Sequence, residues 1–379
     1  MTCARVRRNT ATIALLCLGT ACAPRDVATP TPQWTLTADL RIGSEEDGPT
    51  LFSWVKGLEV DSLGRMFIYE QTDQEIRLFD RDGQFIRLIA RKGSGPGEIL
   101  NAEGIQLARD GRLWIRDEAN GRLTILDGEG VFQGSMTMSS CTSQGRWDPK
   151  EDDTGRMVDV DCRVMAGDPP TYSYVLRAVR RDLSAVDTLQ TQPECRSKEL
   201  DEAATWITRS GTRTTHRPIP FAARPESDFD AIGNVWCAFN SARYEIVRLH
   251  PGHTDTLRIT RDIAALPVTD EERRREIDAL EEKGPTGLDF SRIPAVKPLI
   301  ERIVVDDSAR IWVQRADSKG GFLFDIYRQS GELIATATTS ESRLITWAPF
   351  TVRGDFVYTA VLTADGEPTV VRFKIDRTQ

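Results

Sequence analysis

The stretch GLEVDSLGRMFIYE, residues 57–70, decides the fold, because it returns 47 residues later as GIQLARDGRLWIRD, residues 104–117. In both copies a glycine closes the first turn, and an aromatic residue follows three places later. The agreement continues through the next turn, where Gly83 corresponds to Gly130. Glycine at fixed turn positions has a physical reason, since a tight hairpin needs a backbone conformation that a Cβ atom would strain. The chain is therefore built from a repeated unit of hairpins.

Further copies of this pattern lie along the rest of the chain. DAIGNVW at residues 230–236 and DDSARIW at residues 306–312 keep the acidic start, the turn and the tryptophan. Weaker copies lie at residues 154–159 and 353–358. Together with the first two copies, they make six units, anchored near residues 64, 111, 155, 233, 309 and 354.

Each unit predicts four strands. In the first unit the segments 52–60, 66–70, 76–79 and 85–89 are short, rich in β-branched and aromatic residues, and bounded by Gly and Asp. Four strands per unit at a period in the forties are typical of a β-propeller blade. We therefore predict an all-β, six-bladed β-propeller of four-stranded antiparallel blades with one short helical insertion. A sandwich of two sheets gives no reason for a repeat at a fixed offset.

The segment before the first unit also has strand character. Residues 34–42 read WTLTADLRI, and we expect them to pair beside residues 370–375, so that the last blade has no open edge. On this interpretation residues 34–379 form a single propeller domain.

The units resemble NHL-type repeats and the wider family of six-bladed, TolB-like propellers. The resemblance rests on the Asp-x-x-Gly-x-φ-aromatic starts quoted above, on residues 117–122, and on GSGPGE at residues 93–98. The last of these is similar to a link in bacterial secreted or lipid-anchored propellers of unknown function. The resemblance covers about residues 34–379 and implies the fold. It implies little about activity, since propellers serve as enzymes, receptors and scaffolds alike.

Residues 1–22 have the composition of a secretory signal, with arginines at the start and a short apolar run at residues 11–18. That run is too short to span a bilayer. Small residues then precede Cys22, which we expect to be lipidated as in bacterial lipoproteins; ordinary cleavage at Ala21-Cys22-Ala23, with Pro24 after the cut, is the alternative. By resemblance to such lipoproteins, Ala23 indicates the outer membrane, facing the periplasm or the exterior. Residues 23–33 would be a tether, and the lipid would be the protein's contact with the membrane.

Cysteine usage agrees with an oxidising compartment. Once the leader and the lipidated cysteine are set aside, four cysteines remain, an even number that predicts two disulfides. The more local of the three possible pairings joins Cys141 to Cys162 and Cys195 to Cys237. A structural zinc site is the alternative, but the chain has no Cys-x-x-Cys and its three histidines are not spaced for one.

The charge of the chain argues against nucleic acid as a partner. Its formal net charge is −8, and no basic stripe with interleaved aromatic residues occurs. An acidic protein repels phosphate backbones.

Two links between units are much longer than the others, at about residues 195–227 and 261–298. Both join one unit to the next, so both lie on the same face, where they flank the fourth unit. Insertions on one face of a repeat array usually mark the binding face. In the second insertion, Thr269 and Glu272 form a capping box, which predicts a helix over residues 270–283. We expect a solvated helix on the rim or, alternatively, a lid over the channel mouth.

The second loop of each unit lies on this same face. Carboxylates and amides there could hold calcium, as in the gluconolactonase-like six-bladed propellers. The residues three places after each aromatic are Glu70, Asp117, Phe239 and Arg315, and the last two argue against a symmetric metal cage. Asp and Asn also satisfy turns locally, and a tryptophan can be a packing anchor, so each candidate has a plainer interpretation. The binding-face candidates are Glu70, Asp73, Glu98, Asp117, Asn120, Trp206, His216, Asn240, Arg315 and Asp317.

Signals for catalysis are few. The chain has no Gly-x-Ser-x-Gly, and residues 93–98 lack the Lys-Ser/Thr ending of a phosphate loop. We therefore expect a non-enzymatic binding or interaction scaffold that takes a protein partner or a small ligand at its insertion-bearing face, without a cofactor. The alternative is a metal-dependent hydrolase or lyase with its site in the central channel, for which calcium is the candidate cofactor.

Overall fold

The computed structural model describes residues 31–43, 48–138, 147, 149–165, 171–191, 195, 202–210, 213–250, 257–282, 287–316, 321–341, 348–363 and 365–377. These residues belong to one compact unit, Thr31–Gln379. The predicted leader with Cys22, most of the tether, Cys141 and Asp317 lie outside the described residues.

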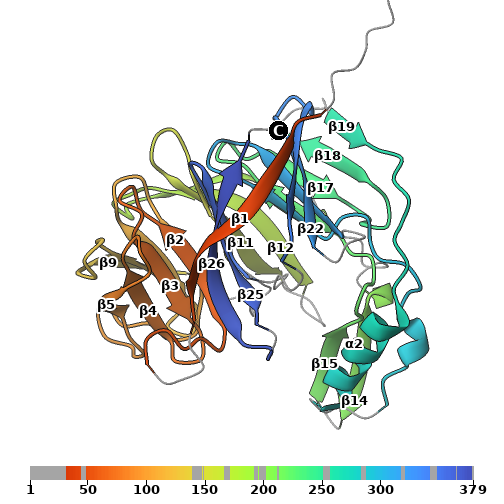
Figure 1. The fold of residues 1–379 in the computed structure, drawn as a ribbon. Helices are drawn as coiled ribbons and strands as arrows, with labels where there is room; N and C mark the ends of the chain where they lie inside the picture. Colours follow the sequence, from red (N-terminus) through yellow and green to blue (C-terminus); the bar gives the residue numbers. More distant parts are fainter. Residues whose placement is uncertain are drawn as a thin grey trace, which may run out of the picture. The chain divides into compact units, whose positions relative to one another are not determined.

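Most of the described chain forms four-stranded antiparallel sheets of consecutive strands (Figure 1). The first sheet contains β2 (Val55–Val60), β3 (Met66–Glu70), β4 (Glu75–Phe79) and β5 (Phe85–Ala90). The second contains β6 (Ala102–Leu107), β7 (Leu113–Asp117), β8 (Arg122–Leu126) and β9 (Phe132–Thr137). The third contains β10 (Lys150–Glu151), β11 (Met157–Met165), β12 (Thr171–Val179) and β13 (Val186–Thr191). The fourth contains β16 (Glu226–Phe229), β17 (Val235–Ala238), β18 (Glu245–Leu249) and β19 (Leu257–Thr260). The four strands predicted for the first unit are confirmed.

The last sheet is larger than the sequence predicts. It has eight strands in spatial order: β20 (Arg302–Val305), β21 (Ile311–Ala316), β22 (Phe322–Tyr327), β23 (Leu333–Thr339), β1 (Gln33–Ile42), β26 (Pro368–Asp376), β25 (Phe356–Leu362) and β24 (Phe350–Arg353). The expected pairing of residues 34–42 is confirmed, because β1 runs antiparallel to β26 from Thr35↔Asp376 to Ile42↔Val370. The first residues of β1 also pair in parallel with β23, and this pairing joins the last two units into one sheet.

The turn motif has a physical explanation in the acidic residue that begins it. In the first unit the Asp61 carboxylate accepts the Arg65 N–H at 2.8 Å, and Gly64 between them has a φ of +80°. In the fifth unit Asp306 accepts the Arg310 N–H at 2.9 Å. The aspartate therefore closes the turn with its side chain, and the left-handed position favours glycine.

The tryptophan that follows the first turn of a unit lies in the core. Trp114, Trp236 and Trp312 are fully buried. Trp236, in the fourth sheet, packs in one cluster with residues of β20, β21 and β22, and Trp312 packs against Phe350 of β24. Each ring thus helps to hold neighbouring units together.

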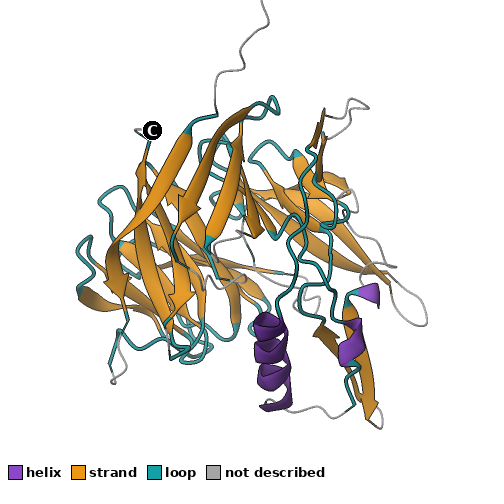
Figure 2. Cartoon of the chain, turned by 45° about the vertical axis from the view of Figure 1, so that its right-hand side comes forward, coloured by secondary structure: helices purple, strands orange, loops and turns teal. Residues whose placement is uncertain are grey.

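The two insertions pack against each other. The first forms the hairpin of β14 (Thr205–Ser210) and β15 (Arg213–Pro218), and the second carries the helix α2 (Asp270–Glu282) and the short helix η1 (Phe290–Arg292) (Figure 2). Trp206, Ile219 and Ile293 form a small core between them, against which Ile277 and Leu280 of α2 are partly buried. We call residues 202–222 and 270–293 the insertion unit. Because α2 packs on the hairpin through so few apolar residues, most of its surface faces solvent.

Two further predictions are confirmed. The capping box closes the start of α2, where the Thr269 N–H donates to Oε2 of Glu272 at 3.0 Å and the Glu272 N–H donates to Oγ1 of Thr269 at 3.2 Å. Cys195 and Cys237 form a disulfide with a Cα–Cα distance of 5.6 Å. Cys141 and the side chain of Cys162 lie outside the described residues. Within the part of the chain that is described, no helix is long and apolar enough to cross a membrane.

Candidate functional site

The second insertion begins as two paired arms rather than as an open loop. The Val268 N–H donates to the carbonyl of Ala295 at 2.9 Å, and the Lys297 N–H donates to that of Leu266 at 2.8 Å. At the base, the Leu299 N–H donates to the carbonyl of Ser241 at 2.7 Å. We call residues 261–268 and 295–300 the stalk. Its backbone hydrogen bonds fix the path of the chain as it leaves β19 and returns to β20.

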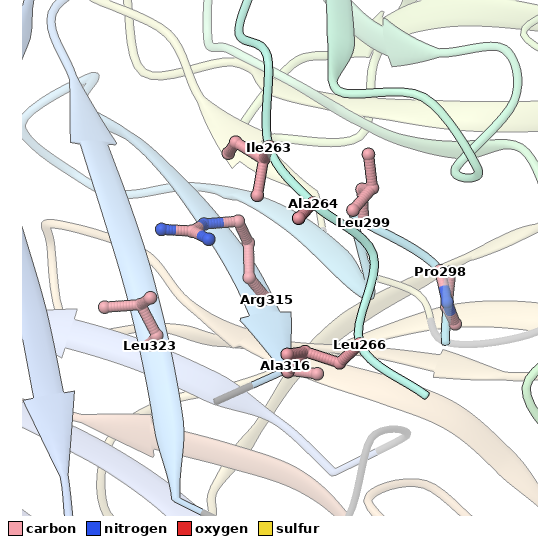
Figure 3. A pocket seen from close by; sticks show the side chains of 8 residues that line it. All are labelled: Ile263, Ala264, Leu266, Pro298, Leu299, Arg315, Ala316 and Leu323. Atoms are coloured by element: carbon pink, nitrogen blue, oxygen red, sulfur yellow. The ribbon is translucent and has the colours of Figure 1, made fainter. Parts of the chain in front are cut away.

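A pocket lies between the stalk and the strands β21 and β22, with a cavity volume of about 140 Å³ (Figure 3). Figure 3 shows the Arg315 side chain extending between Ile263 of the stalk and Leu323 of β22. Arg315 is the one charged residue among those that line the pocket, and the other lining residues are apolar. The complete lining is Ile263, Ala264, Leu266, Pro298, Leu299, Arg315, Ala316 and Leu323.

Behind the pocket, Arg315 belongs to a cluster centred on the fully buried carboxylate of Asp325 in β22. Arg315 pairs with this carboxylate through Nε at 2.8 Å and through Nη2 at 3.2 Å. Arg261, at the start of the stalk, reaches the same carboxylate through Nη1 at 2.7 Å. The Tyr244 hydroxyl donates to it at 2.6 Å. The cluster thereby joins the fourth unit, the stalk and the fifth unit.

The two tyrosines of this cluster are neutral at neutral pH. Tyr244 and Tyr327 share a hydroxyl–hydroxyl hydrogen bond of 2.8 Å. Burial raises the pKa of both hydroxyls, and the nearby charge of Asp325 raises them further. Burial alone would lower the pKa of Arg261, but the Asp325 carboxylate outweighs that effect, and the pKa is raised. Arginine side chains keep their proton in proteins, so both guanidiniums carry a positive charge.

The cluster holds more positive than negative charge. Among the described residues, Asp325 is the one carboxylate that forms an ion pair with either Arg261 or Arg315. Both guanidiniums lie near the ring of Tyr244, at 5.6 Å and 5.9 Å from its centroid, which offers further but weaker compensation. One positive charge therefore has no carboxylate partner within the described cluster, and the Arg315 side chain borders an apolar pocket.

The acidic candidates of the first two units serve the links between units. The buried Glu70 carboxylate accepts the Trp54 N–H at 2.6 Å and the Asp73 N–H at 2.7 Å. At the equivalent position of the second unit, Asp117 accepts the Leu100 N–H at 2.7 Å. These contacts are the local loop hydrogen bonds of the plainer interpretation, and they hold each link onto the sheet that follows it.

The remaining polar candidates of these loops also have local partners. Asn120 donates to the carboxylate of Asp117 at 2.8 Å, and Asn240 accepts the N–H of Ala242 at 3.0 Å. Glu98 accepts the Gly95 N–H, a bond that lowers the pKa of its carboxyl, as does Arg91. The exposed carboxylate of Asp73 pairs with Arg77. None of these four candidates lines the pocket.

The two candidates on the first insertion lie in the hairpin. Trp206 is buried, donates through Nε1 to the carbonyl of Asp289 at 3.0 Å, and meets the Phe290 ring edge-on at 6.0 Å. It thus fills the position of a packing anchor. His216 is exposed and lies opposite Ile207 in the hairpin. Among the candidates that the structure describes, Arg315 is the one that lines the pocket.

Sequence reasoning missed Arg261, Tyr244 and Asp325. A signal for Asp325 was present, because it interrupts the otherwise apolar strand FLFDIY at residues 322–327. An acid at such a position must find cationic or hydroxyl partners when the strand is buried. Two of those partners, Tyr244 and Arg261, could not be read from the sequence, since they come from the fourth unit and the stalk. The third, Arg315, lies on the neighbouring strand of the same unit.

A second hollow lies at the opposite end of the innermost strands. Its lining includes Glu59, Gln106, Lys150 and Arg353, from four different units. These side chains meet partners within the hollow or beside it: the Lys150 ammonium lies 3.4 Å from the carboxylate of Asp228, for example. No three His, Cys, Asp or Glu side chains of the described residues are grouped so that they could hold a metal ion.

The comparisons with known proteins agree with the repeat. A family described as a 6-bladed beta-propeller matches residues 50–141, the segment that holds the first two four-stranded sheets. No curated protein matches the chain. Similar solved structures include virginiamycin B lyase from Staphylococcus aureus, at 10% identity and a TM-score of 0.48, over 90% of this chain and 99% of that one. A Bacteroides fragilis protein described as exported has 11% identity and a TM-score of 0.47, with 90% and 95% covered. The calcium-binding protein regucalcin from Agrobacterium tumefaciens has 12% identity and a TM-score of 0.43, with 91% and 97% covered. In sequence and architecture the chain is similar to β-propellers.

Proposed function

We propose that this protein is an extracytoplasmic six-bladed β-propeller that binds a small ligand at its insertion-bearing face and does not transform it. The eight-stranded sheet supports the blade count. Its two halves, β20–β23 and β24–β26 with β1, are each antiparallel, and they meet at the parallel pairing of β1 with β23. With the four separate four-stranded sheets, this division makes six blades, and β1 is the outer strand of the last.

The proposed location follows from the leader. Residues 11–18 are apolar, arginines precede them, and small residues lead to Cys22. We propose that the chain is lipidated at Cys22 and held at the outer membrane, with the propeller outside the cytoplasm. The disulfide between Cys195 and Cys237 supports an oxidising compartment.

The pocket at the base of the stalk carries the functional proposal. Binding sites in proteins are concave and mostly apolar, with a few polar groups that fix the orientation of the ligand. Here the walls are aliphatic, Arg315 is the polar group, and no lining residue is a nucleophile or a general base. The lining therefore suits recognition and offers no group for bond-breaking chemistry.

A thermal-shift screen of small molecules on the purified protein and its Ala264→Trp variant tests this proposal. Ala264 is exposed at the pocket lining, so a larger side chain there covers the opening without disturbing the core. We expect at least one compound to raise the Tm of the native protein and to leave that of the variant unchanged. Hits that act equally on both proteins, or that are consumed during incubation as judged by mass spectrometry, would contradict the proposal.

A further inference from the structure

We infer that the stalk pocket recognises a monocarboxylate with a compact apolar body, such as one aromatic ring. The inference rests on the proposed function and adds the class of ligand. Three observations carry it: the unequal charges of the cluster, the direction in which Arg315 offers its donors, and the size and chemistry of the walls.

The positive and negative charges of the Asp325 cluster are unequal in number. Arg261 and Arg315 share the single carboxylate of Asp325, and the two tyrosines of the cluster are neutral. Arg315 is largely buried, with 14% of its side chain exposed. A partly desolvated cation without its own counter-charge is costly, and an anion beside it recovers that cost.

The Arg315 guanidinium has N–H donors on more than one edge. Nη2 of Arg315 donates to Asp325 at 3.2 Å, and Nε lies 2.8 Å from the same carboxylate without a hydrogen bond, so Asp325 lies along one side of the guanidinium plane. A guanidinium has more N–H donors than one carboxylate can accept, and the other edge of the fork remains for a second acceptor. Carboxylates match this edge by paired, charge-assisted hydrogen bonds. A single positive charge is neutralised by a monoanion, whereas a phosphate dianion would leave a negative charge in the pocket.

The volume and walls of the pocket limit the apolar body of the ligand. Ile263, Leu266, Leu299 and Leu323 give the pocket aliphatic walls, with a cavity volume of about 140 Å³. A cavity of about 150 Å³ with similar walls is enough to hold benzene. The pocket therefore fits one ring or a short branched chain, and burial of that body against the leucines adds affinity that a free inorganic anion lacks.

Isothermal titration of the purified protein with benzoate and with benzamide tests the inference without any mutation. The two probes share one ring and differ in charge. We expect benzoate to bind at least about ten-fold more tightly, as a charge-assisted pair requires. Equal affinity for the two probes, or no binding of benzoate at millimolar concentration, would overturn the inference.

Three variants localise the binding. Arg315→Met should weaken benzoate binding by at least about ten-fold. Arg328→Met is the matched control: it makes the same change in an exposed arginine just beyond the other end of β22, and benzoate binding should not change. Ala264→Trp should abolish the binding. If Arg315→Met fails to fold, the comparison of benzamide with benzoate and the Ala264→Trp titration still decide the question.

The two proposals fail in different ways. Neutral compounds that bind the native protein and are blocked by Ala264→Trp would leave the binding function in place and overturn the assignment of a carboxylate. Benzoate binding that Ala264→Trp does not change would overturn both, because the ligand would then occupy another part of the molecule.

Discussion

The first and fifth units carry opposite charges at the same two positions. Glu70 and Arg315 each follow the unit's core aromatic by three residues. On the neighbouring strand, Arg77 pairs with Ile68 in the first unit, and Asp325 takes the same register against Val313 in the fifth. Both Arg77 and Asp325 are buried. The repeat thus keeps a buried charge at this place and reverses its sign.

The groups that these charged side chains bind also differ between the two units. Arg77 donates to the backbone carbonyl of Leu51 at 2.6 Å, and Glu70 accepts the Trp54 N–H at 2.6 Å, so both hold the link that precedes their own sheet. In the fifth unit the Asp325 carboxylate is bound by side chains, namely two guanidiniums and a hydroxyl. The preceding link is there replaced by the stalk, which leaves a pocket where the first unit has a tight chain crossing. A departure from the repeat, more than the repeat itself, creates this pocket.

The largest expected effect in this comparison comes from Asp325→Ala. The change leaves two guanidiniums and the Tyr244 hydroxyl without their shared acceptor, and removing one partner of a buried ion pair costs about 3–5 kcal/mol. Urea denaturation measures the loss. The exposed Asp355 is a matched control, because Asp355→Ala should stay within about 0.5 kcal/mol. A loss below about 1 kcal/mol for Asp325→Ala would show that the cluster is not a stabilising centre.

The next largest effect is expected in the pH dependence of stability, which we compare between the native protein and Glu226→Gln. Burial raises the pKa of this carboxyl to about 8, with Arg224 opposing the rise and Glu301 adding to it. The folded protein then keeps a proton that the unfolded chain releases near 4.5, so stability falls as pH rises between these values. In Glu226→Gln this part of the fall should be absent. Parallel stability curves for the native protein and the variant between pH 5 and 8.5 would contradict the assignment.

Glu70→Gln sharpens the contrast between the two units. Glutamine keeps one acceptor oxygen for the Trp54 and Asp73 N–H groups but loses the charge, so we expect a loss of about 1–2 kcal/mol in the free energy of unfolding. Asp117→Asn, at the equivalent position of the second unit, should behave alike. If either variant loses as much free energy of unfolding as Asp325→Ala, the two kinds of buried charge do not differ. The charges that bind a link would then matter as much as the charges of the Asp325 cluster.

Divalent cations should have the smallest effect, because we expect them to leave the Tm unchanged. The carboxylates of Glu70 and Asp117 already accept backbone N–H groups, so binding calcium would mean giving up those bonds. A thermal melt after EDTA treatment, with and without millimolar calcium, checks this. At a hundred-fold excess over Kd a native-state ligand adds about 2.7 kcal/mol of stability, so a rise of several degrees would favour the metal-dependent alternative.

Several features of this protein follow from the sequence by itself. The 47-residue repeat predicts the strands of the first two units, residues 34–42 predict the closing strand, and Thr269 with Glu272 predicts the start of α2. The even number of cysteines predicts two disulfides, and the more local of the three possible pairings contains the disulfide between Cys195 and Cys237. These features depend on local patterns, namely alternation, turn residues and caps, whose physical causes act within a few residues.

The tertiary structure alone decided the site. Arg315 and Asp325 of the fifth unit meet Arg261 of the stalk and Tyr244 of the fourth unit, and no local pattern records which residues face each other across that junction. The same holds for the core around Trp206, where the two insertions meet and Trp206 donates to Asp289, 83 residues further along the chain. Such contacts depend on strand register and on the path of the inserted chain, and these are settled only when the whole fold packs.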